Sequence, residues 1–361
     1  MPTNSSQPIV DAPRTPAYHD RTKLVTLTRI DAFMNRILRN IVPLIAGIIL
    51  IIGLIYVGTA WYFSNQIIVF QSVPIAETVA NSPNESADPD YRDISRFTPD
   101  FDVPNIETDS VVVNDVTLFY DFYENENFAD CAIVFVHGLS SSRESVGLYA
   151  PMFYDLGCNV LAYDSRAHND SSDAYLTFGY YEREEAAAMV DIVAERSNIP
   201  TEQVGVVGIS YGAASALQML AVRSDVAFIV SDSAFSDMRT IVSQQAENIF
   251  GSAINFITPA ALGLAEVRAN FDLETTSSLE AIRANTVPVL LLHSEDDSYT
   301  LPSHAQAIYA AANPEITRLI YQDYGSVHAE SIVDNPEGVR ADVYQFLADY
   351  APDFGNQQPT S

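Results

Sequence analysis

The pattern of hydrophobic and polar residues changes several times along this chain of 361 residues. Residues 41–63 are uncharged and almost continuously apolar, which predicts a helix of about 20 residues that crosses a bilayer. Residues 64–105 are rich in Pro, Asp, Asn and Ser, which predicts a weakly ordered tether, and the apolar residues 67–70 within it have two interpretations, packing back on the domain or continuing at the membrane interface. Residues 106–352 alternate short apolar runs with amphipathic stretches, and residues 353–361 form a polar tail. The alternation is typical of an α/β domain.

Within residues 106–352 the apolar runs have the length of buried strands, and amphipathic stretches typical of helices lie between them. Residues 236–285 contain two further helical stretches, too long together for a plain connection, and we expect them to form a small cap. This order predicts a mostly parallel central sheet with helices on both faces. The strand-like runs include residues 116–123, 132–136, 204–209, 287–292 and 319–321.

Charged residues flank the apolar segment unequally. Residues 1–40 form a basic segment with six Lys and Arg against three Asp, whereas residues 64–91 contain no Lys or Arg. The positive-inside rule therefore predicts a cytoplasmic amino terminus, with the remainder of the chain outside the cytoplasm of a single-pass membrane protein. We expect an uncleaved signal anchor, because the apolar part of a cleaved signal peptide is shorter and closer to the start. Apolar residues at helical spacing within residues 24–38 have two interpretations, an interfacial helix on anionic lipid or a cytoplasmic extension of the membrane helix.

The region after the apolar segment is strongly acidic. Residues 64–361 contain 12 Arg, no Lys and 44 Asp and Glu, so 12 minus 44 gives −32, and residues 1–40 add +3 to give the total of −29. Such a surface repels polyanions, and we expect no nucleic-acid partner. Adaptation to salt, an acidic exterior and drift in base composition all remain open as explanations for the missing lysines.

One strand-like run ends in the pentapeptide Gly208-Ile209-Ser210-Tyr211-Gly212 and leads directly into a helical stretch of small residues. A serine at a sharp turn from strand to helix has a strained backbone, which is tolerated when the neighbours on both sides lack bulk, as Gly208 and Gly212 do. The turn exposes the hydroxyl and aims the first N–H groups of the helix at charge that develops beside it. The segment therefore predicts a nucleophile for acyl transfer.

Partners for this serine follow at the ends of later strand-like runs. Residues 293–297 place Asp296 and Asp297 after one strand, and His328 lies on a loop after the next. An imidazole can take the hydroxyl proton of Ser210, and a carboxylate can orient the imidazole. We favour Asp297 as that carboxylate, with Asp296 as the alternative.

Upstream, the strand-like run of residues 132–136 opens into His137-Gly138-Leu139. With Ser210, Asp297 and His328 in this order, residues 107–350 resemble the serine α/β-hydrolase superfamily, within it the membrane-anchored, extracytoplasmic branch with a small cap that includes esterases and serine aminopeptidases. The resemblance implies an α/β-hydrolase fold and an oxyanion hole made by the backbone N–H groups of Leu139 and Tyr211.

The expected activity is cleavage of a carboxylic ester or thioester of a small-molecule or lipid-like acyl substrate, by a carboxylesterase or lipase-like enzyme. The alternatives are a serine peptidase of the aminopeptidase type, which acts on peptides, and a catalytically silent binding protein of the cell surface. Residues 41–63 make the membrane the second partner. No cofactor is expected, and no metal, because the HExxH and CxxC spacings are absent. In the cap, Phe250, Phe256 and Ile257 are candidates to line the substrate pocket.

The two cysteines lie at matching places. Cys131 precedes His137 by six residues, and Cys158 precedes Asp164 by six. The resemblance therefore places the two cysteines at the starts of the third and fourth strands, which are neighbours in the fold that it implies. Their Cα atoms could then lie within disulfide range, and an outward-facing domain is in an oxidising environment. Two outcomes stay open, a disulfide or two small buried thiols.

Overall fold

A computed structural model describes residues 21–70 and 94–355 of the chain. The chain divides into two compact units, the first ending at Val57 and the second beginning at Gly58. The strands are β1 (Ile106–Val113), β2 (Val116–Tyr123), β3 (Ala132–Val136), β4 (Asn159–Tyr163), β5 (Val204–Ile209), β6 (Phe228–Asp232), β7 (Val289–Ser294) and β8 (Thr317–Gln322). The α-helices are α1 (Arg21–Ile68), α3 (Ala150–Tyr154), α4 (Glu182–Ser197), α5 (Tyr211–Met219), α6 (Met238–Phe250), α7 (Thr258–Ala269), α8 (Ser278–Ile282), α9 (Pro302–Ala311), α10 (Ser331–Asp334) and α11 (Pro336–Tyr350). Short 3-10 turns are η2 (Ile94–Arg96), η3 (Arg143–Leu148), η4 (Thr201–Gln203) and η5 (Ser252–Phe256).

The strands form one eight-stranded sheet in the order β1-β2-β4-β3-β5-β6-β7-β8. The β1–β2 and β2–β4 pairs are antiparallel, and every pair from β4 to β8 is parallel. The mostly parallel sheet expected from the sequence is therefore confirmed. The chain runs from β3 outward to β4 and later returns beside β3 as β5, so the ends of β3 and β5 meet where the strand order reverses, which is where open α/β sheets bind ligands.

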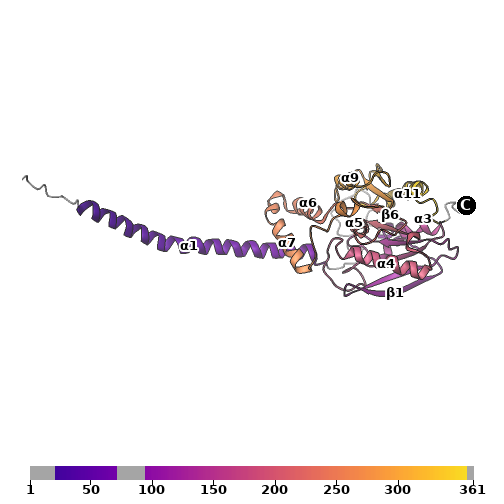
Figure 1. Cartoon of the computed structure of the whole chain (residues 1–361), viewed down its shortest axis with the longest axis horizontal. Coiled ribbons are helices and arrows are strands. Elements are labelled where there is room, and N and C mark those ends of the chain that lie inside the picture. Colours follow the sequence, from indigo (N-terminus) through magenta and orange to yellow (C-terminus); the bar gives the residue numbers. More distant parts are fainter. Residues whose placement is uncertain (1–20, 71–93, 356–361) are drawn as a thin grey trace, which may run out of the picture. The chain divides into compact units, whose positions relative to one another are not determined.

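Helices cover both faces of the sheet (Figure 1). Strands β3, β4, β5, β6 and β7 are buried along their whole length, which explains why they are continuous apolar runs and not alternating ones. One core joins the sheet to α4, α5 and α9, and the other joins it to α3 and α11 through residues such as Phe153 and Phe346. The predicted layers are present on both sides.

Helices α6 and α7, with η5 between them, form the small cap that was expected within residues 236–285. They stand together, apart from the helices that pack on the sheet (Figure 1). Asp237 begins α6 by accepting a hydrogen bond from the N–H of Thr240, and Asn270 ends α7 in a left-handed conformation.

Helix α1 extends beyond the expected limits of 41–63, because it begins at Arg21 and ends at Ile68. Its segment 29–68 is long and apolar enough to cross a membrane and fits a single-pass anchor. A tether from residue 64 was wrong for the first turn, because Ser64 lies in α1 and is fully buried. Residues 67–70 follow the first of their two interpretations, since Ile68 is fully buried and this end of α1 belongs to the second unit. The rest of the expected tether up to residue 93, and the tail from residue 356, lie outside the described residues.

A disulfide joins Cys131 and Cys158, with 4.6 Å between their Cα atoms. Each cysteine stands directly before a strand, and Ala132 of β3 is paired in register with Asn159 of β4. Neighbouring parallel strands bring residues at equivalent positions close together, which places both Cα atoms within the range for a disulfide.

Candidate active site

Ser210 stands at the turn between β5 and α5 with φ 53° and ψ −111°. This backbone conformation is costly for a residue with a side chain, and it persists because both sides of the turn are tightly packed. A Cβ at position 208 would collide with the backbone of Gly212, and one at position 212 would collide with the carbonyl oxygens of Val136 and His137. The two glycines therefore allow the turn that the sequence predicted.

Ser210 meets a histidine and a carboxylate from two distant loops. Its Oγ lies 2.7 Å from Nε2 of His328, and Nδ1 of the same ring lies 2.7 Å from Oδ2 of Asp297. A carboxylate can only accept, so Nδ1 of His328 carries the proton and Nε2 is left to accept the hydroxyl proton of Ser210. The three side chains thus have the order and the distances that proton transfer from the serine requires.

Asp297 is buried and fully engaged, whereas its alternative Asp296 is exposed. The second oxygen of Asp297, Oδ1, accepts hydrogen bonds from the backbone N–H groups of Tyr299 at 2.9 Å and Thr300 at 2.8 Å. His293 lies behind it, with Nε2 at 2.7 Å from the carbonyl oxygen of Thr300 and 3.4 Å from Oδ2 of Asp297. The geometry therefore places Asp297, and not Asp296, behind His328.

The expected oxyanion donors are both beside Ser210. Tyr211 is the first residue of α5, and the loop of Gly138 and Leu139 follows β3, where a Cβ at position 138 would lie 3.6 Å from the Cβ of Ser210. In the part of the chain that the structure describes, neither the N–H of Leu139 nor that of Tyr211 has a hydrogen-bond acceptor. Two free donors next to the serine can stabilise an oxyanion.

His137 fixes the direction of the first donor. The backbone N–H of Ser165 donates to Nε2 of His137 at 3.0 Å, so Nδ1 carries the proton and donates to the carbonyl oxygen of Gly138 at 2.7 Å. The peptide between Gly138 and Leu139 is planar and trans, so holding the carbonyl aims the N–H of Leu139 the opposite way. Burial lowers the pKa of His137 to about 4, which keeps the ring neutral and this pattern intact.

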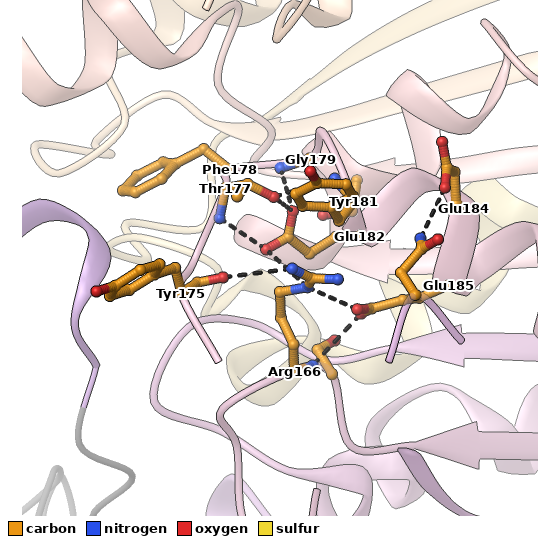
Figure 2. Close-up of polar contacts among 12 residues, drawn as sticks. Arg166, Tyr175, Thr177, Phe178, Gly179, Tyr181, Glu182, Glu184 and Glu185 are labelled. Atoms are coloured by element: carbon orange, nitrogen blue, oxygen red, sulfur yellow. Dashed lines mark hydrogen bonds and ion pairs between the residues drawn. The ribbon is translucent and has the colours of Figure 1, made fainter. Parts of the chain in front are cut away.

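A buried network of charged groups supports the second donor. Figure 2 shows Arg166 reaching between Glu182 and Glu185, with all three side chains almost fully buried. Arg166 Nε donates to Glu185 at 2.6 Å and lies 3.8 Å from Glu182. One cation between two carboxylates leaves a net negative charge inside the domain, which is stable only with further hydrogen bonds.

Those hydrogen bonds converge on Glu182. Its carboxylate accepts from the backbone N–H groups of Thr177 and Gly179, each at 2.9 Å, and from the Thr177 hydroxyl at 2.6 Å. It also accepts from the hydroxyl of Tyr211 at 2.6 Å. Since the backbone N–H of Tyr211 is the second candidate oxyanion donor, Glu182 anchors that residue from its ring end.

The two carboxylates of the network, Glu182 and Glu185, differ in pKa. Burial raises the pKa of Glu185 to about 7, although Arg166 opposes the change. Burial also acts to raise the pKa of Glu182, but the Arg166 charge and the hydrogen bonds from Thr177 and Tyr211 outweigh it, and the pKa is lowered. Glu182 is therefore the carboxylate that stays ionised beside Tyr211.

An apolar cavity of about 230 Å³ adjoins this arrangement. Leu139 and Tyr299 line it, and the ring of Tyr299 lies 4.9 Å from that of His328, centroid to centroid. Phe250 lines it as expected from the sequence, whereas Phe256 and Ile257 do not, because Phe256 projects into solvent with 75% of its surface exposed. No lining residue in the described part of the chain carries a charge, so the cavity fits an uncharged apolar group.

The sequence patterns did not indicate several of these groups. The roles of Arg166 and Glu182 depend on contacts with residues 19 and 29 positions away, Glu185 and Tyr211, and that of His293 on the folding of the loop up to Thr300. Among the residues that the structure describes, no cluster of metal-ligating side chains is found.

Comparison with known families finds one match that covers more than half of the chain. Residues 133–341 match the model of a family described as "Alpha/beta hydrolase family". The uncharacterized protein YqkD of Bacillus subtilis is 27% identical over 217 residues, which cover 60% of this chain and 70% of the relative.

Solved structures with the same fold include the esterase Pf2001 of Pyrococcus furiosus, with a TM-score of 0.54 and 22% identity over 68% of this chain and 93% of the esterase. They also include the acylaminoacyl peptidase of Pyrococcus horikoshii, with a TM-score of 0.53 and 15% identity over 70% of this chain and 42% of the peptidase. At these identities the likeness concerns the fold alone.

Proposed function

The chain belongs to the alpha/beta hydrolase family, and we propose that it is a membrane-anchored serine hydrolase that cleaves a carboxylic ester or thioester. Membership in this family confirms the fold class expected from the sequence, an α/β-hydrolase fold with an eight-stranded, mostly parallel sheet. The observation that carries the proposal is the alignment of Ser210, His328 and Asp297 through two contacts of 2.7 Å.

In this proposal the hydroxyl oxygen of Ser210 attacks the acyl carbon while Nε2 of His328 takes its proton. The N–H groups of Leu139 and Tyr211 hold the negative oxygen that forms, and Asp297 stabilises the charged imidazole. The imidazolium then gives its proton to the departing alcohol or thiol, and a water molecule repeats the steps on the acyl-serine. The products are the free acid and the restored hydroxyl.

An ester or thioester is favoured over a peptide by the lining of the cavity. A peptidase of the aminopeptidase type must bind the ammonium group of its substrate, and a buried ammonium needs a carboxylate partner. The lining residues that the structure describes include no carboxylate. An apolar acyl group needs none.

We also propose that the catalytic unit lies outside the cytoplasm. The basic residues before the apolar segment and their absence in residues 64–91 support this orientation. The disulfide between Cys131 and Cys158 supports it independently, because disulfides persist in oxidising compartments.

The test uses the full chain in detergent and a fluorophosphonate probe, which labels an activated serine covalently. We expect labelling of the wild type and none of Ser210→Ala. A set of p-nitrophenyl esters compared with aminoacyl-nitroanilides then separates esterase from peptidase. An unlabelled wild type would indicate a silent binding protein, and turnover of nitroanilides alone would indicate a peptidase.

A further inference from the structure

The end of α1 forms part of the cavity beside the candidate active site. Phe63 and Ile67 of α1, together with Phe70 just after it, line the same space as Leu139 and Tyr299. One apolar cavity thus extends from the last turns of α1 to Leu139, a candidate oxyanion donor, and to Tyr299, which lies beside His328. All these lining residues belong to the second unit, which begins at Gly58.

This end of α1 is held firmly in the second unit. Ala60, Ser64 and Ile68, spaced by four residues, are buried on one face of the helix. From the cap, the guanidinium of Arg268 donates to Oγ of Ser64 at 2.6 Å and to Oδ1 of Asn65 at 3.1 Å. The α1 wall of the cavity is therefore as fixed as its cap wall.

The cavity lies close to the segment that fits a membrane anchor. Phe63 follows Val57 by six residues, so the chain can separate them by no more than about 20 Å in any arrangement. The ring of Phe63 packs edge-on against Phe250 of the cap at 5.1 Å. The cap is thus in contact with the end of α1 that belongs to the second unit.

The cap also carries an exposed apolar surface, which is unusual for a protein surrounded by water. Its members are large side chains with more than half of their surface exposed, at 69%, 54%, 75% and 77% for Ile249, Phe250, Phe256 and Val267. Such surfaces mark contacts with membranes or with other proteins. Their place on the elements that hold the end of α1 favours the membrane.

We propose that the cavity takes the acyl chain of a lipid ester directly from the bilayer, with the cap resting on the membrane surface. This inference rests on the proposed function, since the acyl chain would occupy the cavity while Ser210 attacks the ester carbon. The lipid is electrically neutral, because the acidic catalytic unit repels anionic headgroups. The lipid alcohol leaves with the proton from His328, and water then releases the fatty acid from Ser210.

The first test compares a variant that fills the cavity with a matched one that does not. Ala246 lines the cavity from α6, whereas Ala253 is exposed on η5 and lies outside it. In Ala246→Phe we expect hydrolysis of p-nitrophenyl decanoate to fall at least tenfold while hydrolysis of p-nitrophenyl acetate stays within about twofold. Ala253→Phe should change neither rate. Retained acetate hydrolysis shows that the variant is folded, and equal effects on both esters would overturn the inference.

The second test concerns the source of the lipid. The full chain is placed in phosphatidylcholine vesicles that contain a monoacylglycerol, and the release of fatty acid is measured for wild type, Ser210→Ala and Ala246→Phe. We expect release by the wild type only. Hydrolysis of p-nitrophenyl decanoate without release from vesicles would overturn the membrane source, whereas a wild type that cleaves no ester at all would instead refute the proposed function.

Discussion

The two sides of Ser210 are formed by different kinds of groups, side chains on one side and backbone N–H groups on the other. On one side two side chains, His328 and Asp297, make the contacts themselves. On the other side the candidate oxyanion donors are backbone N–H groups of Leu139 and Tyr211, which buried side chains orient from behind. The first side can be removed by one substitution, whereas the second can be changed only by disturbing its supports.

This difference also separates the demands on charge. The base side needs an imidazole that gains and loses a proton, and His328 is partly open to solvent. The oxyanion side needs groups whose protonation stays constant, and His137 and Glu182 are fully buried. A fixed network pre-organises the donors, so that little rearrangement is needed when charge develops on the substrate.

The largest effect should come from breaking the base side. Asp297→Asn would leave the conformation of the loop intact but favour the wrong tautomer of His328. We therefore expect kcat to fall roughly 10⁴-fold. The matched control Asp296→Asn changes an exposed neighbour and should keep nearly full activity. Ester hydrolysis by purified variants measures both, and equal losses would contradict the assignment of Asp297.

An intermediate effect should come from a support of the oxyanion side. In Glu182→Gln one carboxylate oxygen is replaced by an NH2 group, which donates and cannot accept hydrogen bonds, so at least one of the donors to Glu182 loses its partner. We expect kcat to fall about tenfold to a hundredfold with KM nearly unchanged, because the shifted Tyr211 N–H acts mainly on the transition state.

Tyr211→Phe is the companion variant, since it removes the hydroxyl that donates to Glu182 and accepts from the backbone N–H of Phe178. Its kcat should fall in the same direction but less, and its KM should again stay close to the wild-type value. A rise in KM with unchanged kcat in either variant would show that Glu182 serves substrate binding and not the oxyanion.

The smallest effect concerns acid stability of the oxyanion side. His168 is buried beside His137, with 4.9 Å between the ring centroids. Burial lowers the pKa of His137 to about 4 and that of His168 to about 3. Below pH 6.5 these histidines are protonated in the unfolded chain but stay neutral in the folded one. As the pH falls from 7.5 to 5.5, each histidine should therefore reduce the free energy of unfolding by about 1.4 kcal/mol. Glu185, with its pKa raised to about 7, acts in the opposite direction over this range.

Denaturant unfolding of the full chain in detergent at both pH values measures this loss. In His168→Gln we expect the loss on acidification to be smaller than in the wild type by about 1.4 kcal/mol, because one of the two histidines is gone. An unchanged pH dependence in this variant would show that His168 does not contribute to acid instability.

Much of the fold was predictable because its signals are local. Apolar runs of strand length separated by helical stretches predicted a mostly parallel sheet, and the glycines at 208 and 212 marked the turn at Ser210. Asp297 and His328 could be found because loops after parallel strands meet at one edge of the sheet. Their roles stay predictions, although the structure brings all three side chains together.

The supports of the site were beyond the sequence for a physical reason. Glu182 and Arg166 look like ordinary charged residues in the sequence, and only the packing of a distant loop shows that they are buried. At the end of α1 the polar residues 64–66 fitted a tether, and the apolar residues 67–70 fitted either packing on the domain or continuation at the interface. Burial of Ser64 depends on Arg268, which lies 204 positions later in the chain.

The buried face of α1 has a practical meaning for anyone who wishes to prepare this hydrolase without the apolar segment that fits a membrane anchor. A shortened protein that starts after residue 63, where the apolar stretch stops, would lack Ala60 and Phe63 and keep Arg268 without its aromatic partner Trp61. Such a protein would be released into solution, but its apolar cavity would lack the part of the wall that Phe63 forms. Soluble preparations should therefore retain the chain from Gly58 onward.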